Sequence, residues 1–220
     1  MKNMFADHPH YANGWNRSVI VLIVGFYCFA ILGSFFPSWE GVALALSLYV
    51  ISGLGVTVWY HRYFTHGSFE TYVPVWSIGA VAGLLSGEGP PIFWVGWHAL
   101  HHQKSDTAED PHSPHFGGFL HAHQLWMMAY THPDRYRRMY LRYTPRWMLR
   151  DKFLLFLNHS YRYWHFGIIT LLALSGYAYG GWYYLASFVG YGYFVRTVLI
   201  LNATWCVNSL AHLYGSQPYK

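Results

Sequence analysis

Long apolar segments separated by short polar breaks run through most of this chain, and their lengths predict helices that cross a membrane. The apolar segments cover residues 18–36, 41–60, 165–184 and 186–210. Each is close to the roughly 20 apolar residues that an α-helix needs to span a bilayer. Short breaks around Ser38 and Gly181 join them in pairs. The pattern predicts an all-α integral membrane protein with four transmembrane helices in two hairpins.

A further apolar segment, Val73 to Val95, does not fit that description. It contains Glu88 and the sequence Gly89-Pro90-Pro91, and both a carboxylate and a proline pair are costly at membrane depth. If the segment crossed the bilayer once, the histidines before and after it would face opposite compartments. We expect it to form a non-spanning helix within a cytoplasmic cap, residues 61–164.

Two clusters of histidine lie at the ends of apolar segments: His61 with His66, and His98 with His101 and His102. Residues three and four apart share one face of a helix, so the second cluster can present three imidazoles together. The five-residue spacing of the first cluster fits a helix end that is unwinding. Imidazole is the commonest metal ligand in proteins and suits iron, copper, zinc and nickel. We therefore expect a metal site.

The alternative is that these are interfacial histidines without a metal, hydrogen-bonded to water and phosphate. That alternative is the better interpretation for the isolated histidines of the chain. They are His8, His10, His132, His159 and His165.

The fourth apolar segment ends in a further candidate pair, Asn208 and His212. The two residues are four apart and share a helix face. In the four-helix topology this segment returns the chain to the side on which both histidine clusters lie. A sixth histidine is then within reach of the same site.

Composition and charge agree with a membrane protein. The 220 residues are 54% hydrophobic and 10% charged, against about 25% charged residues in a typical soluble domain. Ten of the 14 Lys and Arg lie between His61 and Arg162, so by the positive-inside rule this loop and both termini, including residues 1–17, are cytoplasmic. The two cysteines lie within apolar segments and indicate no disulfide framework. The same placement of charge argues against a nucleic-acid partner.

Several motifs, taken in order, resemble those of the membrane fatty acyl desaturases of the stearoyl-CoA delta-9 type, particularly the bacterial members. The resemblance runs from about Gly53 to the C-terminus. The motifs are His61-x4-His66, His98-x2-His101-His102, Asp106-x3-Asp110-Pro111-His112, Asn202-Ala203-Thr204-Trp205 and Asn208-x3-His212.

The resemblance implies a reaction, a cofactor and a set of ligands. Such enzymes introduce a cis double bond into a long acyl chain with O2 and two electrons at a histidine-ligated di-iron centre. By the resemblance, Asn208 holds an iron-bound water, and Asp106, Glu109 and Asp110 orient imidazole N–H groups, although a solvated acidic turn is an equal alternative for these three. The implied iron ligands are His61, His66, His98, His101, His102 and His212.

The resemblance also bears on the substrate and the partners. Trp94, Thr204 and Trp205 match positions that line the bend of an acyl tunnel. Glu88 is a fourth candidate substrate-binding residue, where family members often have glutamine. Family members often carry arginine where this chain has Ala99, so an acyl-CoA and an acyl-lipid or acyl-carrier substrate both stay open. Electrons would come from a separate ferredoxin or cytochrome b5 with its reductase. The location implied is a membrane, the inner one if the protein is bacterial.

One family motif is not found in this sequence. Members continue to a further His-x2-His-His box, whereas this chain reaches Lys220 without it. We expect the chain to be a partial desaturase in which one iron position at most approaches full ligation. The alternatives are a related membrane di-iron hydroxylase, a b-type cytochrome, or another histidine-rich metal-binding or transport protein.

Overall fold

The computed structural model describes residues 14–129, 137–138 and 141–216, and its regular elements in this range are helices. An isolated bridge between Trp15 and Ala129 is the one β-type pairing among these residues. The all-α prediction is therefore confirmed. The elements, with η for π-helical segments, are α1 Arg17–Ser34, α2 Trp39–Leu54, η1 Gly55–Thr65, α3 Val73–Leu84, α4 Pro91–Lys104, α5 Pro114–Gly117, η2 His121–Leu125, α6 Trp126–Met128, α8 Lys152–Val189, η3 Gly190–Val195 and α9 Arg196–Leu213.

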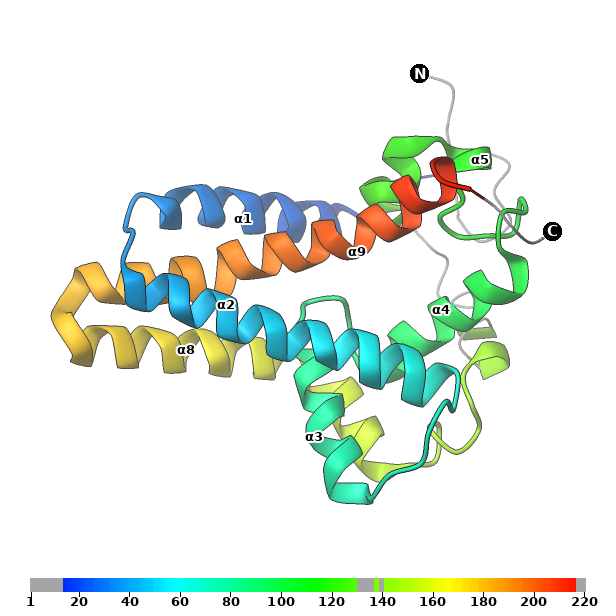
Figure 1. Ribbon diagram of the computed structural model, residues 1–220, viewed down its shortest axis with the longest axis horizontal. Helices are drawn as coiled ribbons and strands as arrows, with labels where there is room; N and C mark the ends of the chain where they lie inside the picture. The colour runs from blue at the N-terminus through cyan, green and yellow to red at the C-terminus, as the bar shows by residue number, and fades with distance from the viewer. Residues whose placement is uncertain (1–13, 130–136, 139–140, 217–220) are drawn as a thin grey trace.

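Three continuous helices in the described residues are long and apolar enough to cross a membrane. They are Arg17–Ser34, Trp39–Thr65 and the 62-residue Lys152–Leu213. The last leaves helical geometry at Gly180 and at Gly181, where φ is 74°, a conformation that glycine adopts without strain. The chain folds back there, and the two arms lie side by side at the left of Figure 1.

Two predicted boundaries need correction. The helix expected from residue 165 begins at Lys152, where the Asp151 side chain accepts a hydrogen bond of 2.9 Å from the backbone N–H of Leu154. Polar residues at 158–160 and Arg162 interrupt the apolar pattern within this part of the helix. The single helix expected over Val73 to Val95 is two helices, α3 and α4, because Gly87 and Gly89 adopt φ values of 89° and 112° in the turn between them.

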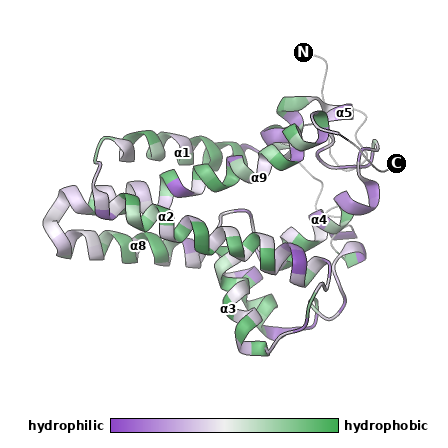
Figure 2. Ribbon diagram, viewed as in Figure 1, coloured by the Kyte–Doolittle hydropathy of each residue, from purple (hydrophilic) through white to green (hydrophobic). Residues whose placement is uncertain are grey.

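The apolar core that fixes the histidine-bearing segments lies between η1, α3, α4 and the start of α8. Its buried members include Tyr60, Trp76, Leu84, Ile92 and Leu154. Polar positions gather at the end of the molecule that carries α4 and α5, whereas the long helices are mostly apolar (Figure 2). The core therefore holds η1 and α4 together at the polar end.

Small residues allow close backbone contact at the opposite end. Gly33 of α1 faces Gly190 of η3, and a Cβ built on Gly33 would lie 2.5 Å from the Gly190 Cα. That distance is far below van der Waals contact, so any side chain here must separate the two helices.

We predict that Gly33→Ala lowers the thermal midpoint of the purified protein in detergent, because overpacking of this kind costs about 1–3 kcal/mol. The matched control is Gly25→Ala in the same helix, where a Cβ meets nothing within 4 Å and the higher helix propensity of alanine is stabilising by up to about 1 kcal/mol. Equal midpoints for the two variants would contradict the close contact.

Candidate metal centre

The π-helical winding of η1 brings the first histidine cluster together. Its backbone bonds run between residues five apart, as in the 3.2 Å bond from the His66 N–H to the His61 carbonyl. Residues five apart therefore lie on one face, and the centroids of the two rings are 4.7 Å apart. A continuous π-helix, rather than an unwinding helix end, explains the spacing. Such segments are rare and are frequent at functional sites.

The second cluster meets the first from α4. The His98 ring lies 4.7 Å from the His61 ring, and the His102 ring lies 4.7 Å from the His66 ring. The Nε2 atoms of His98 and His102 are 2.9 Å apart. One nitrogen from each of the four residues lies within 4.8 Å of the others. These four histidines, His61, His66, His98 and His102, are called the four-histidine group below.

The electrostatics of this group favour a metal. Burial, with the neighbouring histidines, lowers the pKa of His98 to about 2 and that of His102 to about 4. Both rings are therefore neutral at physiological pH, which leaves a nitrogen lone pair on each for coordination. Four converging imidazoles form a donor set that suits iron or zinc, so these residues fit a metal ion.

The third member of the second cluster lies in a separate group. His101 and Asp110 share hydrogen bonds of 3.0 and 3.1 Å between Nδ1 and the two carboxylate oxygens. The His112 ring lies 4.3 Å from the His101 ring, and one donor atom from each of the three residues falls within 4.8 Å of the others. Burial lowers the pKa of His112 to about 3. This set is called the His–Asp–His group below.

The remaining predicted ligands and acidic residues lie around these two groups. The His212 ring is 5.2 Å from the His101 ring, and its Nδ1 is 3.1 Å from an Asp106 carboxylate oxygen. Glu109 forms an ion pair with Lys104 at 2.9 Å. His112 was not among the ligands that the sequence analysis singled out, although the adjacent Asp110-Pro111-His112 motif was a signal for it.

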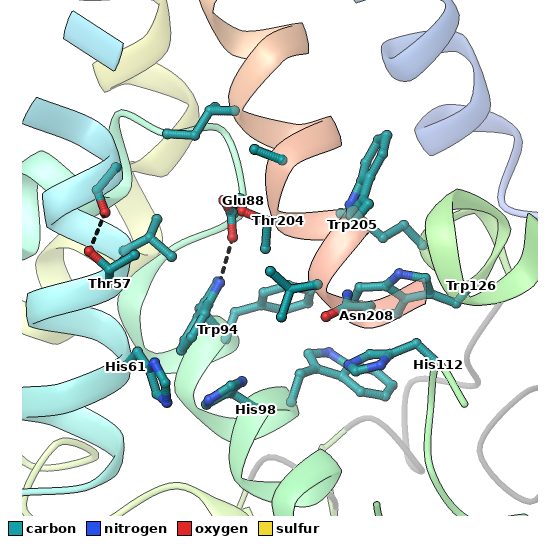
Figure 3. Close-up of a pocket in the computed structure, with 18 of the residues that line it drawn as sticks. Thr57, His61, Glu88, Trp94, His98, His112, Trp126, Thr204, Trp205 and Asn208 are labelled. Carbon is teal, nitrogen blue, oxygen red and sulfur yellow. Dashed lines mark hydrogen bonds between the residues drawn. The ribbon is translucent and has the colours of Figure 1, made fainter. Parts of the chain in front are cut away.

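An apolar pocket of about 300 Å³ opens beside the four-histidine group, lined from α2, η1, α4 and α9. Figure 3 shows His61, His98, His112 and Asn208 bordering it. Trp205 contributes to the wall from α9 and is itself buried. An apolar ligand fits this lining far better than a polar one.

Glu88 joins two walls of the pocket. Its carboxylate accepts hydrogen bonds from the Trp94 indole N–H at 2.8 Å and from the Thr204 hydroxyl at 2.6 Å. The Trp94 ring in turn stacks on His98, with centroids 4.4 Å apart. Burial raises the pKa of Glu88 to about 7, against the effect of the two hydrogen bonds. Three of the four predicted pocket residues therefore form one hydrogen-bonded set next to a histidine.

We predict that Glu88→Gln removes a pH dependence of stability. Because burial raises the folded-state pKa of Glu88 from 4.5 to about 7, the folded protein holds this proton more tightly than the unfolded chain does. The free energy of unfolding of the wild type therefore falls as pH rises through that interval, by up to about 3 kcal/mol. Glutamine carries no titrating proton; its amide oxygen can still accept from the Trp94 N–H, and its amide N–H can donate to the Thr204 hydroxyl.

The measurement is denaturant unfolding in detergent at about pH 5 and about pH 8. The free energy of unfolding of Glu88→Gln, relative to that of the wild type, should increase from the lower to the higher pH. Glu70→Gln, at an exposed position, should show the same pH dependence as the wild type. If the difference in free energy of unfolding between Glu88→Gln and the wild type were the same at both pH values, the role of the Glu88 proton would be contradicted.

Comparison with known proteins finds relatives over most of this chain. The chain is 36% identical over 210 residues to the sn-2 palmitoyl-lipid 9-desaturase of Nostoc sp., covering 92% of this chain and 69% of that protein. It is 39% identical over 189 residues to the sn-1 stearoyl-lipid 9-desaturase of Synechocystis sp., covering 84% and 54%. It is 32% identical over 190 residues to the hex-5-enoyl-[acyl-carrier protein] acetylenase of Moorena producens, covering 81% and 57%.

These three relatives are therefore matched over 54% to 69% of their own length. A family model described as fatty acid desaturase matches residues 37–220. The matched range includes every histidine of both groups as well as His212. The chain belongs to the fatty acid desaturase family.

Proposed function

We propose that this protein introduces a cis double bond into a long-chain acyl group held in the membrane, with O2 as co-substrate. The observation that carries the proposal is the four-histidine group at the border of an apolar pocket. An unactivated methylene pair offers no acidic proton to a general base, so a protein site without a strong oxidant has no route to the product. A histidine metal site beside a space for an alkyl chain meets that need.

Two iron ions are the proposed cofactor. The four-histidine group holds the first, and His101 and His212, with Asn208 through a water, hold or border the second. Bound iron supplies the oxidising power with O2 that cleaves an alkyl C–H bond. Asp110 fixes the orientation of the His101 ring through the hydrogen bond described above, and Asp106 does the same for His212. Glu109 would act only at the edge of this network.

The pocket residues would bind and orient the acyl chain. Trp94 donates a hydrogen bond from its indole N–H to Glu88, and its ring stacks on His98. These two contacts fix its position relative to the metal ligands. Thr204 anchors the same carboxylate from α9. A fixed wall next to the metal ligands determines which methylene pair stops beside them, and the apolar lining excludes water.

The overall reaction fixes what partners are needed. Two hydrogens leave the acyl chain, and with O2, two electrons and two protons they form two waters. The electrons come from a separate donor of the ferredoxin or cytochrome b5 type. Because relatives are named as acyl-lipid 9-desaturases, we propose an acyl-lipid substrate and the delta-9 position, ahead of an acyl-CoA.

The proposed topology follows from the hairpins and the charges. The two arms of α8–η3–α9 serve as the third and fourth spans, with α1 and α2–η1 as the first two. Ten of the 14 Lys and Arg lie between His61 and Arg162, which favours the cytoplasmic side for the cap and for both termini.

We predict that His98→Ala abolishes desaturation. Changing a residue that only orients a metal ligand already costs about 10–100-fold in activity, so loss of a ligand should cost about 100-fold or more. Insertion into the membrane should persist, because it depends on the apolar helices. The measurement is gas chromatography with mass spectrometry of cellular lipids in a desaturase-deficient host. The control is His159→Ala, since His159 is exposed and belongs to neither group. Hydroxylated products from the wild type would favour a hydroxylase, and unchanged unsaturation in His98→Ala would contradict the proposal.

A second prediction concerns topology. Single cysteines at Ser68 and Gln103, in a background with Cys28 and Cys206 changed to serine, should react with a membrane-impermeant reagent from the cytoplasmic side. A cysteine at Trp182, in the bend between the two arms, should react from the opposite side. Ser68 and Gln103 labelled from opposite sides would exclude a shared metal centre.

A further inference from the structure

We propose that residues 116–120, which join α5 to η2, insert into the cytoplasmic leaflet of the membrane and anchor the cap there. These residues are called the 116–120 loop below. The inference goes beyond the proposed reaction and uses none of its metal chemistry. It takes from the proposed topology only that α1 spans the bilayer and begins on the cytoplasmic side. Its failure would therefore leave the proposed reaction standing.

The 116–120 loop exposes three large apolar side chains that lie close together in the sequence. The exposed fractions of Phe116, Phe119 and Leu120 are 60%, 41% and 66%. The two residues between the phenylalanines are glycines, so no polar side chain interrupts the loop. Gly118 turns the chain with a φ of 79°, which glycine adopts without strain. Single exposed apolar residues are ordinary on a protein surface, whereas contiguous apolar patches mark interaction sites.

A chain of side-chain contacts sets the depth of the loop relative to α1. The Nε2 atom of His123 lies 3.3 Å from the side-chain oxygen of Asn202 in α9, and the Asn202 amide donates to the Tyr27 hydroxyl at 2.9 Å. Tyr27 lies ten residues into α1, about 15 Å along the helix from its start. The Phe119 ring stacks on the His123 ring, with centroids 5.5 Å apart. Phe119 therefore lies at the level of the first half of α1.

The helical turns after the loop are attached to the same part of α1. Met127 and Met128 of α6 pack against the apolar cluster around the buried Ile23. The backbone N–H of Asn16, the N-cap of α1, donates to the Met128 carbonyl at 2.8 Å. Figure 1 shows α5 beside the end of α9, at the end of the molecule where α1 begins. The loop is thus held where α1 enters the bilayer.

Charge indicates how the loop would bind a membrane. Residues 105–129 contain no lysine or arginine, and Asp106, Glu109 and Asp110 are the charged residues of this stretch. Interfacial segments bind by burial of apolar side chains and, where they are basic, by attraction to anionic lipids. Only the first contribution is open to this loop, and phenylalanine and leucine are typical of the buried face of such segments. The occupant is therefore the hydrocarbon edge of the leaflet, without a preference for anionic headgroups.

An anchor at this position bears on the pocket. Trp126 and Met127, which follow η2 directly, line one side of it. The His123 Nδ1 atom also lies 3.0 Å from the Ser209 hydroxyl in α9, so the turns after the loop bridge α1 and α9. Insertion of the loop would hold this wall of the pocket at the edge of the bilayer, where the acyl chains of membrane lipids lie.

Quenching by a lipid-borne nitroxide tests the insertion. Phe119→Cys, in a background with Cys28 and Cys206 changed to serine, is labelled with the dye NBD and reconstituted in phosphatidylcholine vesicles. Lipids with a nitroxide on the acyl chain should quench this dye about as strongly as a dye at Val21→Cys, since Val21 of α1 is 72% exposed. The matched control is Thr107→Cys, at an exposed position of the cap, which should stay unquenched.

Two outcomes would overturn the inference. The first is a dye at residue 119 that behaves like the dye at residue 107, which would place the loop in water. The second is an emission shifted to shorter wavelength but unquenched by the nitroxide lipid, which would indicate that a second copy of the chain covers the loop. Addition of anionic lipid to the vesicles should leave the quenching at residue 119 unchanged.

Photo-crosslinking of the unsubstituted protein provides a second measurement, which does not depend on the folding of a variant. A phosphatidylcholine with a diazirine on its acyl chain is irradiated in vesicles that contain the protein, and the adducts are located by mass spectrometry. We expect adducts within residues 116–120 and on α1, and none within residues 105–110. Adducts on α1 with none in the 116–120 loop would overturn the inference.

Discussion

The contact between the rings of His61 and His98, 4.7 Å apart, is the constraint on which the rest of the structure depends. The two residues lie on η1 and α4, with α3 and two turns between them in the chain. For the rings to meet, the chain must leave η1, pack α3 against it and return to the same end of the molecule. The glycine-rich turn between α3 and α4 permits that return because glycine accepts the positive φ values that it requires.

Buried polar residues hold this return path in place. Arg196 of α9 is 1% exposed and donates hydrogen bonds to the Leu85 carbonyl at 2.5 Å and to the Ser52 hydroxyl at 3.4 Å. It thus ties α2, the end of α3 and α9 together. The same turn carries Glu88, whose bonds to Trp94 and Thr204 reach α4 and α9. The wall of the pocket and the positions of the metal ligands are therefore parts of one network.

Much of this arrangement could be predicted from the sequence, because hydrophobic runs and histidine spacings depend on local geometry. The all-helical fold, the break near Gly181 and the pairing of His98 with His102 are of this kind. The partners of Arg196 and Glu88 depend on which helices pack together, which no local pattern specifies. The proximity of His112 to His101 was missed for the same reason, since it arises from the path of the loop after α4. The π-helical winding of η1 could not be predicted from the sequence either, because its residues have the pattern of an ordinary helix end.

The account leads to a chemical claim about the four-histidine group: its imidazoles create a metal site at the border of an apolar pocket. X-ray absorption at the iron edge, on protein loaded with one equivalent of iron(II), tests this claim most directly. We expect nitrogen scatterers at about 2.1 Å with the multiple-scattering pattern of imidazole, weakened when His98 is changed to alanine. A first shell of oxygen atoms without the imidazole pattern, unaffected by that change, would contradict the claim.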